Sequence, residues 1–349
     1  MHEYSGSIHM HSIFSDGTGD ARDIAFTAGE VGLDFIILTD HNTLRAMDEG
    51  YEGFYNNTFL MVGTEINDKD NKNHYLALGI NKTVSTRIPA KEYVTKVKEM
   101  GGIGFLAHPH EKRNAFAEHP PYPWLEWDTD DFTGIEIWNH MSEWMENLTE
   151  DNKLQSFVHP LKTIIAPPQE TLMKWDELSS DRKVVGIGGI DAHAHKVNIV
   201  GLFDVEVFPY KVLFKSIRTY ILTHEEIRPG RTNEEIAAAK RIILDALKNG
   251  RCFVGNYYHG DPAGFRFTAE TGGRIYNMGD TVELKEKIRL RCVHPADSAE
   301  IRFIHNGVNF HTATADCDEV FVEEPGVYRV EVWQDEKGWI FSNHIRVQY

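Results

Sequence analysis

The chain has 349 residues and a formal net charge of −17 at pH 7. Such an acidic chain is a poor general binder of nucleic acid, because nucleic-acid affinity depends on neutralising phosphates with Lys and Arg. The sequence contains no apolar run long enough to span a bilayer, so a membrane protein is not expected. The length favours one large domain followed by a smaller one.

The cysteines and the N-terminus narrow the class further. Cys252, Cys292 and Cys317 form no C-x-x-C pair, so neither a disulfide framework nor a zinc finger is expected. The first residues lack the basic start and apolar run of a signal peptide. This start predicts a cytoplasmic protein, or an exported one if a signal peptide has been removed.

Up to about residue 257, short apolar runs alternate with helical segments. The helix predicted at 20–32 has Asp20 as its N-cap and Gly32 as its stop. Residues 34–39 are continuously apolar, as expected of a strand buried on both faces. The other predicted elements are strands at 7–11, 59–64 and 74–79, a helix at 89–100, strands at 103–107, 134–138 and 184–190, a helix at 233–248, and a strand at 252–254.

This alternation indicates parallel β/α units. About seven such units favour a closed or nearly closed barrel over a small open sheet. After residue 257, apolar and polar residues alternate between turns such as Asn306-Gly307, which predicts antiparallel strands without helices. The expected domains are a barrel at 1–257 and a small Ig-like β-sandwich at 258–349.

The first chemical signal is His9-Met-His11, followed by Asp16 and Gly17. In an extended strand, side chains at i and i+2 point to the same face, so the two imidazoles would stand side by side. A pair of imidazoles beside a carboxylate can hold a divalent metal ion. On its own the pair is equally well explained as ordinary surface or hydrogen-bonded histidines.

Further polar side chains follow the ends of the other predicted strands, at the face where parallel barrels build active sites. Each alone is explained as a turn former or cap, but turn formation does not explain their joint occurrence. The candidate metal ligands are His9, His11, Asp16, His41, Glu65, His74, His108, His140, Asp191 and His193. They exceed the needs of one tetrahedral site, so two or three clustered Mn, Fe or Zn ions are expected.

These residues lie in motifs that resemble those of the PHP superfamily (polymerase and histidinol phosphatase domains) over residues 5 to about 255. The motifs, in order, are His9-x-His11, Ser15-Asp16-Gly17, Thr39-Asp-His41, Gly63-Thr-Glu65, Ala107-His108-Pro109 and Asp191-x-His193. The resemblance implies a distorted (β/α)7 barrel, a centre of two or three metal ions and phosphoester hydrolysis. It does not cover the β-rich tail, although some family members carry a C-terminal sandwich.

The resemblance also implies how the ligands are shared. Asp16 stands where some relatives have histidine, as in the branch that cleaves phosphates of nucleotides or nucleic acids. The implied sets are His9, His11, Glu65 and Asp191 for a first metal; Glu65, His108 and either His74 or His140 for a second; and Asp16, His41 and His193 for a third.

Clustered divalent ions neutralise phosphate oxygens and lower the pKa of a bridging water, which favours phosphoester hydrolysis. In that mechanism Glu65 and Asp191 are the catalytic carboxylates, and Arg113 or Lys196 supplies a cation for the phosphoryl group. The expected substrate is a small phosphorylated metabolite or nucleotide. The candidates for protonating the leaving alkoxide, among which the sequence does not decide, are His195, His110 and His140.

Two other readings stay open. The first is a metal-dependent amidohydrolase, because related barrels with similar metal clusters cleave amides or lactones. The second is a binding module whose sandwich recognises a carbohydrate or a protein through Trp333, Trp339 and Phe341, if these side chains are exposed. Residues 116–127 form an irregular aromatic segment, either a lid that stacks on substrate or, as we expect, a loop packed on the barrel.

Overall fold

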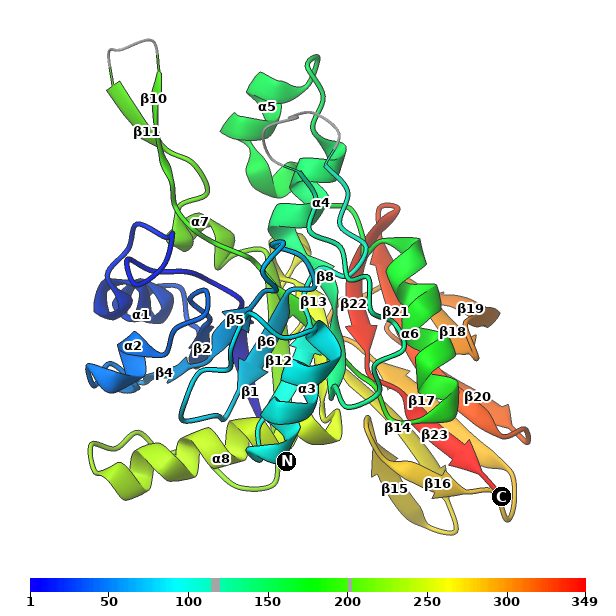
Figure 1. The fold of residues 1–349 in the computed structure, drawn as a ribbon. Helices are drawn as coiled ribbons and strands as arrows, with labels where there is room; N and C mark the ends of the chain where they lie inside the picture. The colour runs from blue at the N-terminus through cyan, green and yellow to red at the C-terminus, as the bar shows by residue number, and fades with distance from the viewer. Residues whose placement is uncertain (114–119, 200–202) are drawn as a thin grey trace.

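The computed structural model describes residues 1–113, 120–199 and 203–349 (Figure 1). The chain mixes strands and helices as far as β13 (Cys252–Asn256). From β14 (Arg266–Thr271) onwards the chain forms strands and no α-helix. This change agrees with the change of pattern in the sequence, whereas the domain boundary at 257/258 stays a prediction.

The first sheet contains the N-terminal strand β1 (His2–Ile8). β1 pairs in parallel with β2 (Phe35–Leu38), and β2 pairs in parallel with β4 (Thr58–Val62). The short β3 (Gly53–Tyr55) is antiparallel to β4 at the edge. All residues of β2 and β4 are buried, which explains why both read as unbroken apolar runs.

A second sheet holds the middle of the chain in the order β5-β6-β7-β8-β9. Its strands are β5 (Thr64–Ile66), β6 (Tyr75–Leu78), β7 (Ile103–Leu106), β8 (Gly134–Asn139) and β9 (Val185–Gly189). The pairs β7–β8 and β8–β9 are parallel. The pairs β5–β6 and β6–β7 are antiparallel.

The expectation of uniformly parallel β/α units is therefore wrong. Residues 67–74 alone connect β5 to β6, and a parallel crossover needs a dozen or more residues. In the first sheet, the edge of β1 that does not face β2 pairs antiparallel with β12 (Ile217–Thr223), and β12 pairs antiparallel with β13. The structure is thus a mixed α/β fold.

The two sheets meet through single bridges. Met10 bridges Ala192 in parallel, and His41 bridges Glu65 in parallel. Next to the first bridge, the backbone N–H of Ile190 donates to the carbonyl of Ile8 at 3.0 Å. The end of β9 is thereby brought beside the end of β1, but continuous ladders do not close a barrel within the described residues.

Helices cover the sheets and carry the end signals seen in the sequence. The Asp20 side chain caps α1 (Ala21–Glu30) by accepting from the N–H of Arg22 at 2.8 Å. α8 (Asn233–Asn249) ends at Gly250, whose φ of 73° suits glycine. Figure 1 shows α8 at the opposite end of this region from α4 and α5. The other helices are α2 (Arg45–Asp48), α3 (Ala90–Glu99), α4 (His140–Asn147), α5 (Lys153–Val158), α6 (Gln169–Asp181) and α7 (Tyr210–Leu213).

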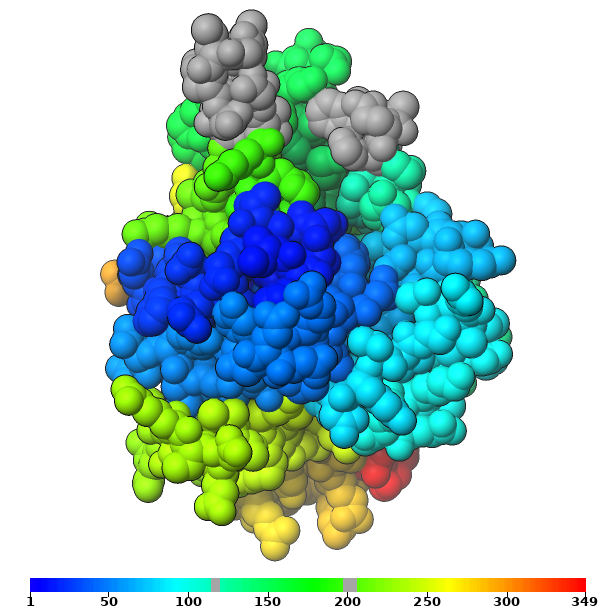
Figure 2. Space-filling model, turned by 60° about the vertical axis from the view of Figure 1, so that its left-hand side comes forward, coloured from blue at the N-terminus to red at the C-terminus, as the bar shows by residue number. Residues whose placement is uncertain are grey.

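One hairpin, β10 (Lys196–Ile199) with β11 (Phe203–Glu206), projects beside α7 (Figure 1). Figure 2, in which the left-hand side of Figure 1 is turned toward the viewer, shows the surface of the N-terminal third above α8. Within the described ranges, no helix combines the length and the hydropathy needed to cross a bilayer.

The C-terminal strands form two sheets on one shared core. A four-stranded sheet has the order β15-β14-β17-β20, and the remaining strands extend the first sheet through pairing of β13 with β22. Phe267 and Leu290 of the four-stranded sheet share a buried cluster with Phe303 and Val330 of the other. These strands are β15 (Arg274–Asn277), β16 (Thr281–Glu283), β17 (Ile288–Val293), β18 (Ala299–His305), β19 (Val308–Ala315), β20 (Cys317–Val322), β21 (Gly326–Gln334), β22 (Lys337–Ser342) and β23 (Ile345–Gln348).

A buried ionic network joins α6 to this C-terminal part. The guanidinium of Arg329 donates to both carboxylate oxygens of Asp176, at 2.7 and 2.8 Å, and to Glu331 at 2.6 Å. The ring of His344 lies 2.7 Å from the same aspartate. Of the aromatic residues proposed for ligand recognition, Trp339 is 2% exposed and Phe341 is fully buried, so both belong to the core.

Candidate metal centre

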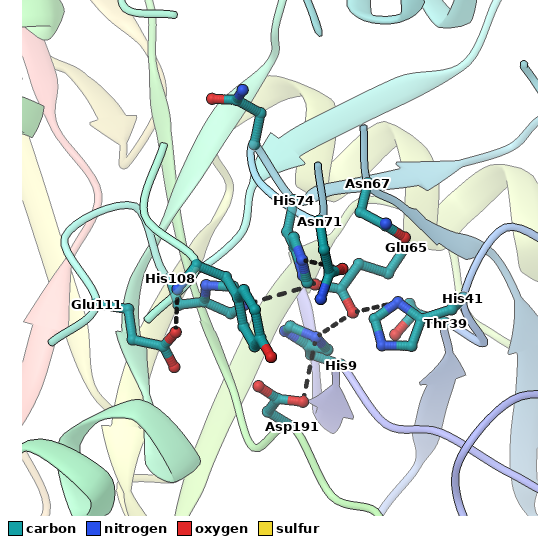
Figure 3. Close-up of polar contacts among 12 residues, drawn as sticks. His9, Thr39, His41, Glu65, Asn67, Asn71, His74, His108, Glu111 and Asp191 are labelled. Carbon is teal, nitrogen blue, oxygen red and sulfur yellow. Dashed lines mark hydrogen bonds and ion pairs between the residues drawn. The ribbon is translucent and has the colours of Figure 1, made fainter. Parts of the chain in front are cut away.

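The polar residues that follow the strands converge on one cluster, as predicted (Figure 3). The segment after β1 supplies His9 and His11, and β5 supplies Glu65. The segment after β9 supplies Asp191. Residues separated by more than 180 positions thus meet because the ends of β1 and β9 lie side by side.

Glu65 stands at the middle of the cluster and is 1% exposed. Each of its carboxylate oxygens faces imidazole nitrogens from different segments of the chain (Figure 3). Its Oε2 lies 3.1 Å from His9 Nε2, 3.2 Å from His11 Nε2 and 3.4 Å from His41 Nδ1; its Oε1 lies 2.7 Å from His74 Nδ1 and 3.3 Å from His108 Nε2. One carboxylate in this position can be shared by more than one ion.

Within the described residues, ligand atoms of the cluster fall into four overlapping groups in which all atoms lie within 4.8 Å of one another. The groups are His9, His11 and Asp191; His9, Glu65 and His108; His41, Glu65 and His74; and His11, Asp16, His41 and His193. All of the candidate ligands except His140 are thereby brought together. The group that contains Asp16 also contains His41 and His193, the set that the resemblance implies for a third ion.

The chemistry of the cluster fits divalent metal ions. His9 and His11 are fully buried, yet the Nε2 atoms of both rings have no hydrogen-bond partner among the described residues. Buried polar atoms nearly always have a hydrogen-bond partner or another ligand, so we expect these nitrogens to bind one. Mixed imidazole and carboxylate donors suit Zn, Mn or Fe.

The electrostatics point the same way. Burial opposes ionisation of Glu65 and Asp191, but the surrounding imidazoles, His9 first, hold the pKa of both carboxyl groups well below the ordinary range. Burial likewise opposes charge on His11, but Asp191 and Glu65, whose carboxylate oxygens lie 3.4 and 3.2 Å from its Nε2, raise its pKa to about 10. Burial lowers the pKa of His41 to about 4. The site therefore concentrates negative charge that favours cations.

Glu136, a carboxylate that the sequence analysis missed, contacts two candidate ligands, His9 and His108. Glu136 in β8 is 1% exposed and places Oε1 2.9 Å from His9 Nδ1. Its Oε2 accepts from the backbone N–H of His108 at 2.8 Å and from Asn139 Nδ2 at 2.9 Å. A Cβ on Gly189 would lie 1.9 Å from Glu136 Oε1, so glycine is needed there. The available signal was a lone charge inside the apolar strand Gly-Ile-Glu-Ile-Trp.

The local backbone differs from the predicted strand at 7–11. β1 ends at Ile8, and His9 has a φ of 65°, so strand alternation does not place His9 beside His11. His108 and Asp191 also have positive φ, 27° and 54°. Non-glycine residues in this region are strained, and such residues cluster at functional sites.

A cavity of about 380 Å³ opens over the cluster. Arg113 and His195 line it together with the polar residues of the centre. His110 instead lies 3.1 Å from Thr171 Oγ1 and does not line this cavity. His140 is fully buried, with neither ring nitrogen hydrogen-bonded to a described residue, and it also lies outside the cavity lining.

The described part of the segment 116–127 packs on the protein. Residues 114–119 lie outside the described residues, so the structure bears on the lid interpretation only from residue 120. Trp124 is 2% exposed, as expected for packing. Tyr122 stacks on His74 with ring centroids 5.1 Å apart, and the guanidinium carbon of Arg113 lies 4.8 Å from the centroid of the Tyr122 ring. This segment thus supports one side of the centre.

No protein-family model matches the chain. An uncharacterised protein of Methanocaldococcus jannaschii is 27% identical over 105 residues, which are 28% of this chain. The chain spans about half, 56%, of the length of that curated relative.

Two of the solved structures similar to the chain carry a proposed metal-dependent phosphoesterase activity, and one of these two is described as PHP-like. A two-domain protein from Bacteroides vulgatus that contains a predicted PHP-like metal-dependent phosphoesterase has a TM-score of 0.41 and 16% identity, with 98% of this chain and 95% of that chain covered. A proposed metal-dependent phosphoesterase from Bifidobacterium adolescentis has a TM-score of 0.37 and 17% identity, with 59% and 93% covered. An amidohydrolase from Chromobacterium violaceum has a TM-score of 0.33 and 13% identity, with 54% and 87% covered.

With TM-scores below 0.5, the structural similarity to these three proteins does not assign an activity to this chain. The fold and the site define the protein at a coarser level. It is a mixed α/β protein with clusters of His, Asp and Glu that could hold metal ions, built where β1, β5 and β9 end.

Proposed function

We propose that the protein is a metal-dependent phosphoesterase of PHP type that hydrolyses small phosphate esters. The observation that supports this best is Glu65, a buried carboxylate shared by overlapping groups of imidazole and carboxylate donors. Such an arrangement suits two or three Mn, Fe or Zn ions held close together. The bound ions would neutralise phosphate oxygens and make water a better nucleophile at neutral pH.

In this proposal the protein's own side chains have separate tasks. His9, His11 and Asp191 hold one ion with Glu65, and Glu136 fixes the orientation of the His9 ring. A second ion would be held by Glu65, His74 and His108, because both imidazoles face Glu65 Oε1, and a third by Asp16, His41 and His193.

Two groups on the cavity wall act on the substrate itself. Arg113 lines the cavity and carries a charge that suits a phosphoryl group. Its Nη2 also lies 2.7 Å from the buried carboxylate of Glu111, which holds the guanidinium in place. His195 lines the same cavity and would protonate the leaving alkoxide.

The test measures bound metal and phosphate release together. The purified protein is analysed for Mn, Fe and Zn and then assayed on a panel of phosphate monoesters, phosphate diesters and amides, with and without a chelator. We expect phosphate release that a chelator abolishes and that His9→Ala lowers together with metal content. His224→Ala, a change of an exposed histidine, serves as the matched control. Absence of bound metal, or hydrolysis of amides without phosphate release, would refute the proposal.

A further inference from the structure

The cavity over the metal centre has one wall of a different character. Besides the polar groups, its lining contains apolar side chains from α4, α5 and the segment before α7. They are Met141, Trp144, Met145, Phe157, Val207 and Phe208.

This wall is built around aromatic packing. The ring of Trp144 meets the rings of Phe208 and Phe157 edge-on, with centroids 4.6 and 5.0 Å apart. Trp144 is 2% exposed and Phe208 is 7% exposed, so their rings are held by the protein on most sides. The wall is therefore formed before a ligand arrives, as in most small-molecule sites.

The backbone supports the same reading. Phe208 has a φ of 56°, a conformation that is a clear outlier for a bulky side chain. Strained residues of this kind persist where the surroundings require them, often at ligand sites. Here the strained residue is the one whose ring completes the wall against Trp144.

The wall offers almost no hydrogen bonds. Its one polar side-chain group, Trp144 Nε1, already donates to the carbonyl of Ser156 at 3.1 Å. A sugar hydroxyl or the polar edge of a nucleobase placed here would lose its hydration without gaining partners, which is unfavourable. An alkyl or aryl group would instead gain from leaving water.

We propose that this wall binds an apolar alkyl or aryl group on the alcohol side of the phosphate ester. The inference rests on the proposed function, because the polar half of the cavity would hold the phosphoryl group. A cavity of about 380 Å³ lies at the small end of ligand sites, so it suits a compact monoester. The specificity would thus exclude phosphorylated sugars and nucleotides.

Binding of unreactive ligands tests the wall without relying on catalysis. Calorimetry with the Mn²⁺-loaded protein measures affinity for n-alkylphosphonates from methyl to hexyl. We expect affinity to rise by about fourfold for each added methylene that the wall covers. Affinity that does not rise with chain length would overturn the inference, whether or not the protein hydrolyses esters.

Two near-isosteric variants place the effect on the wall. Met141 and Val207 are only partly buried, so Met141→Gln and Val207→Thr leave the core intact. Each should weaken hexylphosphonate binding by on the order of tenfold and methylphosphonate binding by less than about twofold. Met173→Gln, on a side chain of α6 that is 60% exposed, is the matched control and should change neither affinity. Equal losses for both phosphonates would refute a role for the wall.

Hydrolysis separates this inference from the proposed function. Phenyl phosphate and 4-propylphenyl phosphate have leaving groups of similar acidity, and glycerol phosphate has a polar one. We expect kcat/KM to be highest for the propylphenyl ester. Phosphate release from none of the three by the metal-loaded protein would refute the proposed function. Release that favours glycerol phosphate would leave the proposed function standing and refute the apolar site.

Discussion

The choice between His74 and His140 as a ligand of the second ion gives the sharpest test of the centre. His74 Nδ1 lies 2.7 Å from Glu65 Oε1, within a group that also includes His41. His140 belongs to none of the four groups, and burial alone lowers its pKa to about 3, so its ring is neutral. We therefore expect His74→Ala to remove an ion and His140→Ala to leave the ions in place.

The size of the effect follows from the position of His74. Loss of a partner that only orients a ligand weakens metal binding by about 10–100-fold, so loss of a donor should weaken it by at least about 100-fold. At a free metal concentration of about ten times Kd, occupancy of that ion would fall from about 0.9 to about 0.1. The other groups, which do not contain His74, should keep their ions.

The assay is equilibrium dialysis at buffered free Mn²⁺, followed by elemental analysis and a thermal melt of each variant. His74→Ala should lose about one ion per chain and, with it, the roughly 1.4 kcal/mol of stability that this ion supplies at ten times Kd, in addition to the cost of truncating a buried ring. His140→Ala should keep its metal but lose stability, by about 2 kcal/mol or more, because a fully buried side chain is truncated. Loss of an ion from His140→Ala with full occupancy in His74→Ala would refute this reasoning.

Three further predictions concern other parts of the molecule. Arg113→Ala should lower kcat/KM for phosphate release by about 10²–10³-fold. The control is Lys112→Ala, which removes an adjacent side chain that is 51% exposed and should change kcat/KM little. Equal effects of the two changes would contradict a role for Arg113 in the cavity. Asp176→Asn should lower the free energy of unfolding by about 3–5 kcal/mol in urea denaturation, because Arg329 is left buried without its main counter-charge. Burial opposes ionisation of Asp176, but Arg329 outweighs this effect and lowers the pKa of Asp176 to about 2. The stability that the ionised carboxylate supplies is therefore present above about pH 4 and is lost as the pH falls through 2. A difference in unfolding free energy between wild type and Asp176→Asn that persists undiminished at pH 2 would contradict this prediction. Metal binding at pH 7 should release at least about one proton, because buried carboxylates outweigh the desolvation of His11 and raise its pKa to about 10. Calorimetry in two buffers with different ionisation enthalpies measures the number of protons released. That number should fall as the pH rises through 10, and a number that does not change with pH would contradict the role of His11 as a metal ligand.

The set of residues at the site was predictable because it depends on where strands end. Short apolar runs mark buried strands, and parallel strands place their carboxyl ends at one edge. The antiparallel β6 brings its amino end to that edge instead, where His74 precedes the strand. The structure brings His41 beside Glu65, and Asp191 beside His9 and His11, even though the strands are not all parallel. The prediction required only that β2, β5 and β9 exist and lie near one another.

What could not be predicted depends on partners that are distant in the sequence. β12 was missed because its seven residues, Ile-Arg-Thr-Tyr-Ile-Leu-Thr, include a charge that usually marks the surface. In the structure Arg218 is 2% exposed and is paired with the carbonyls of Phe214 and Val31. The apolar wall depends on a similar meeting of distant segments, because α4 and the segment before α7 are more than 60 residues apart in the sequence.

The same dependence explains why most of the candidate ligands come together although the predicted local geometry was wrong. His9 and His11 were expected to share a face by strand alternation, but the strand ends before them. His9 adopts its left-handed backbone while its carbonyl accepts from the N–H of Asp191 at 2.7 Å, and His108 adopts its own while its N–H donates to Glu136 at 2.8 Å. Each such conformation costs about 1–3 kcal/mol and persists only when surrounding contacts impose it. Local sequence preference and tertiary demand therefore conflict at the candidate ligands themselves, which is the expected mark of a site held ready for its ions rather than of a turn.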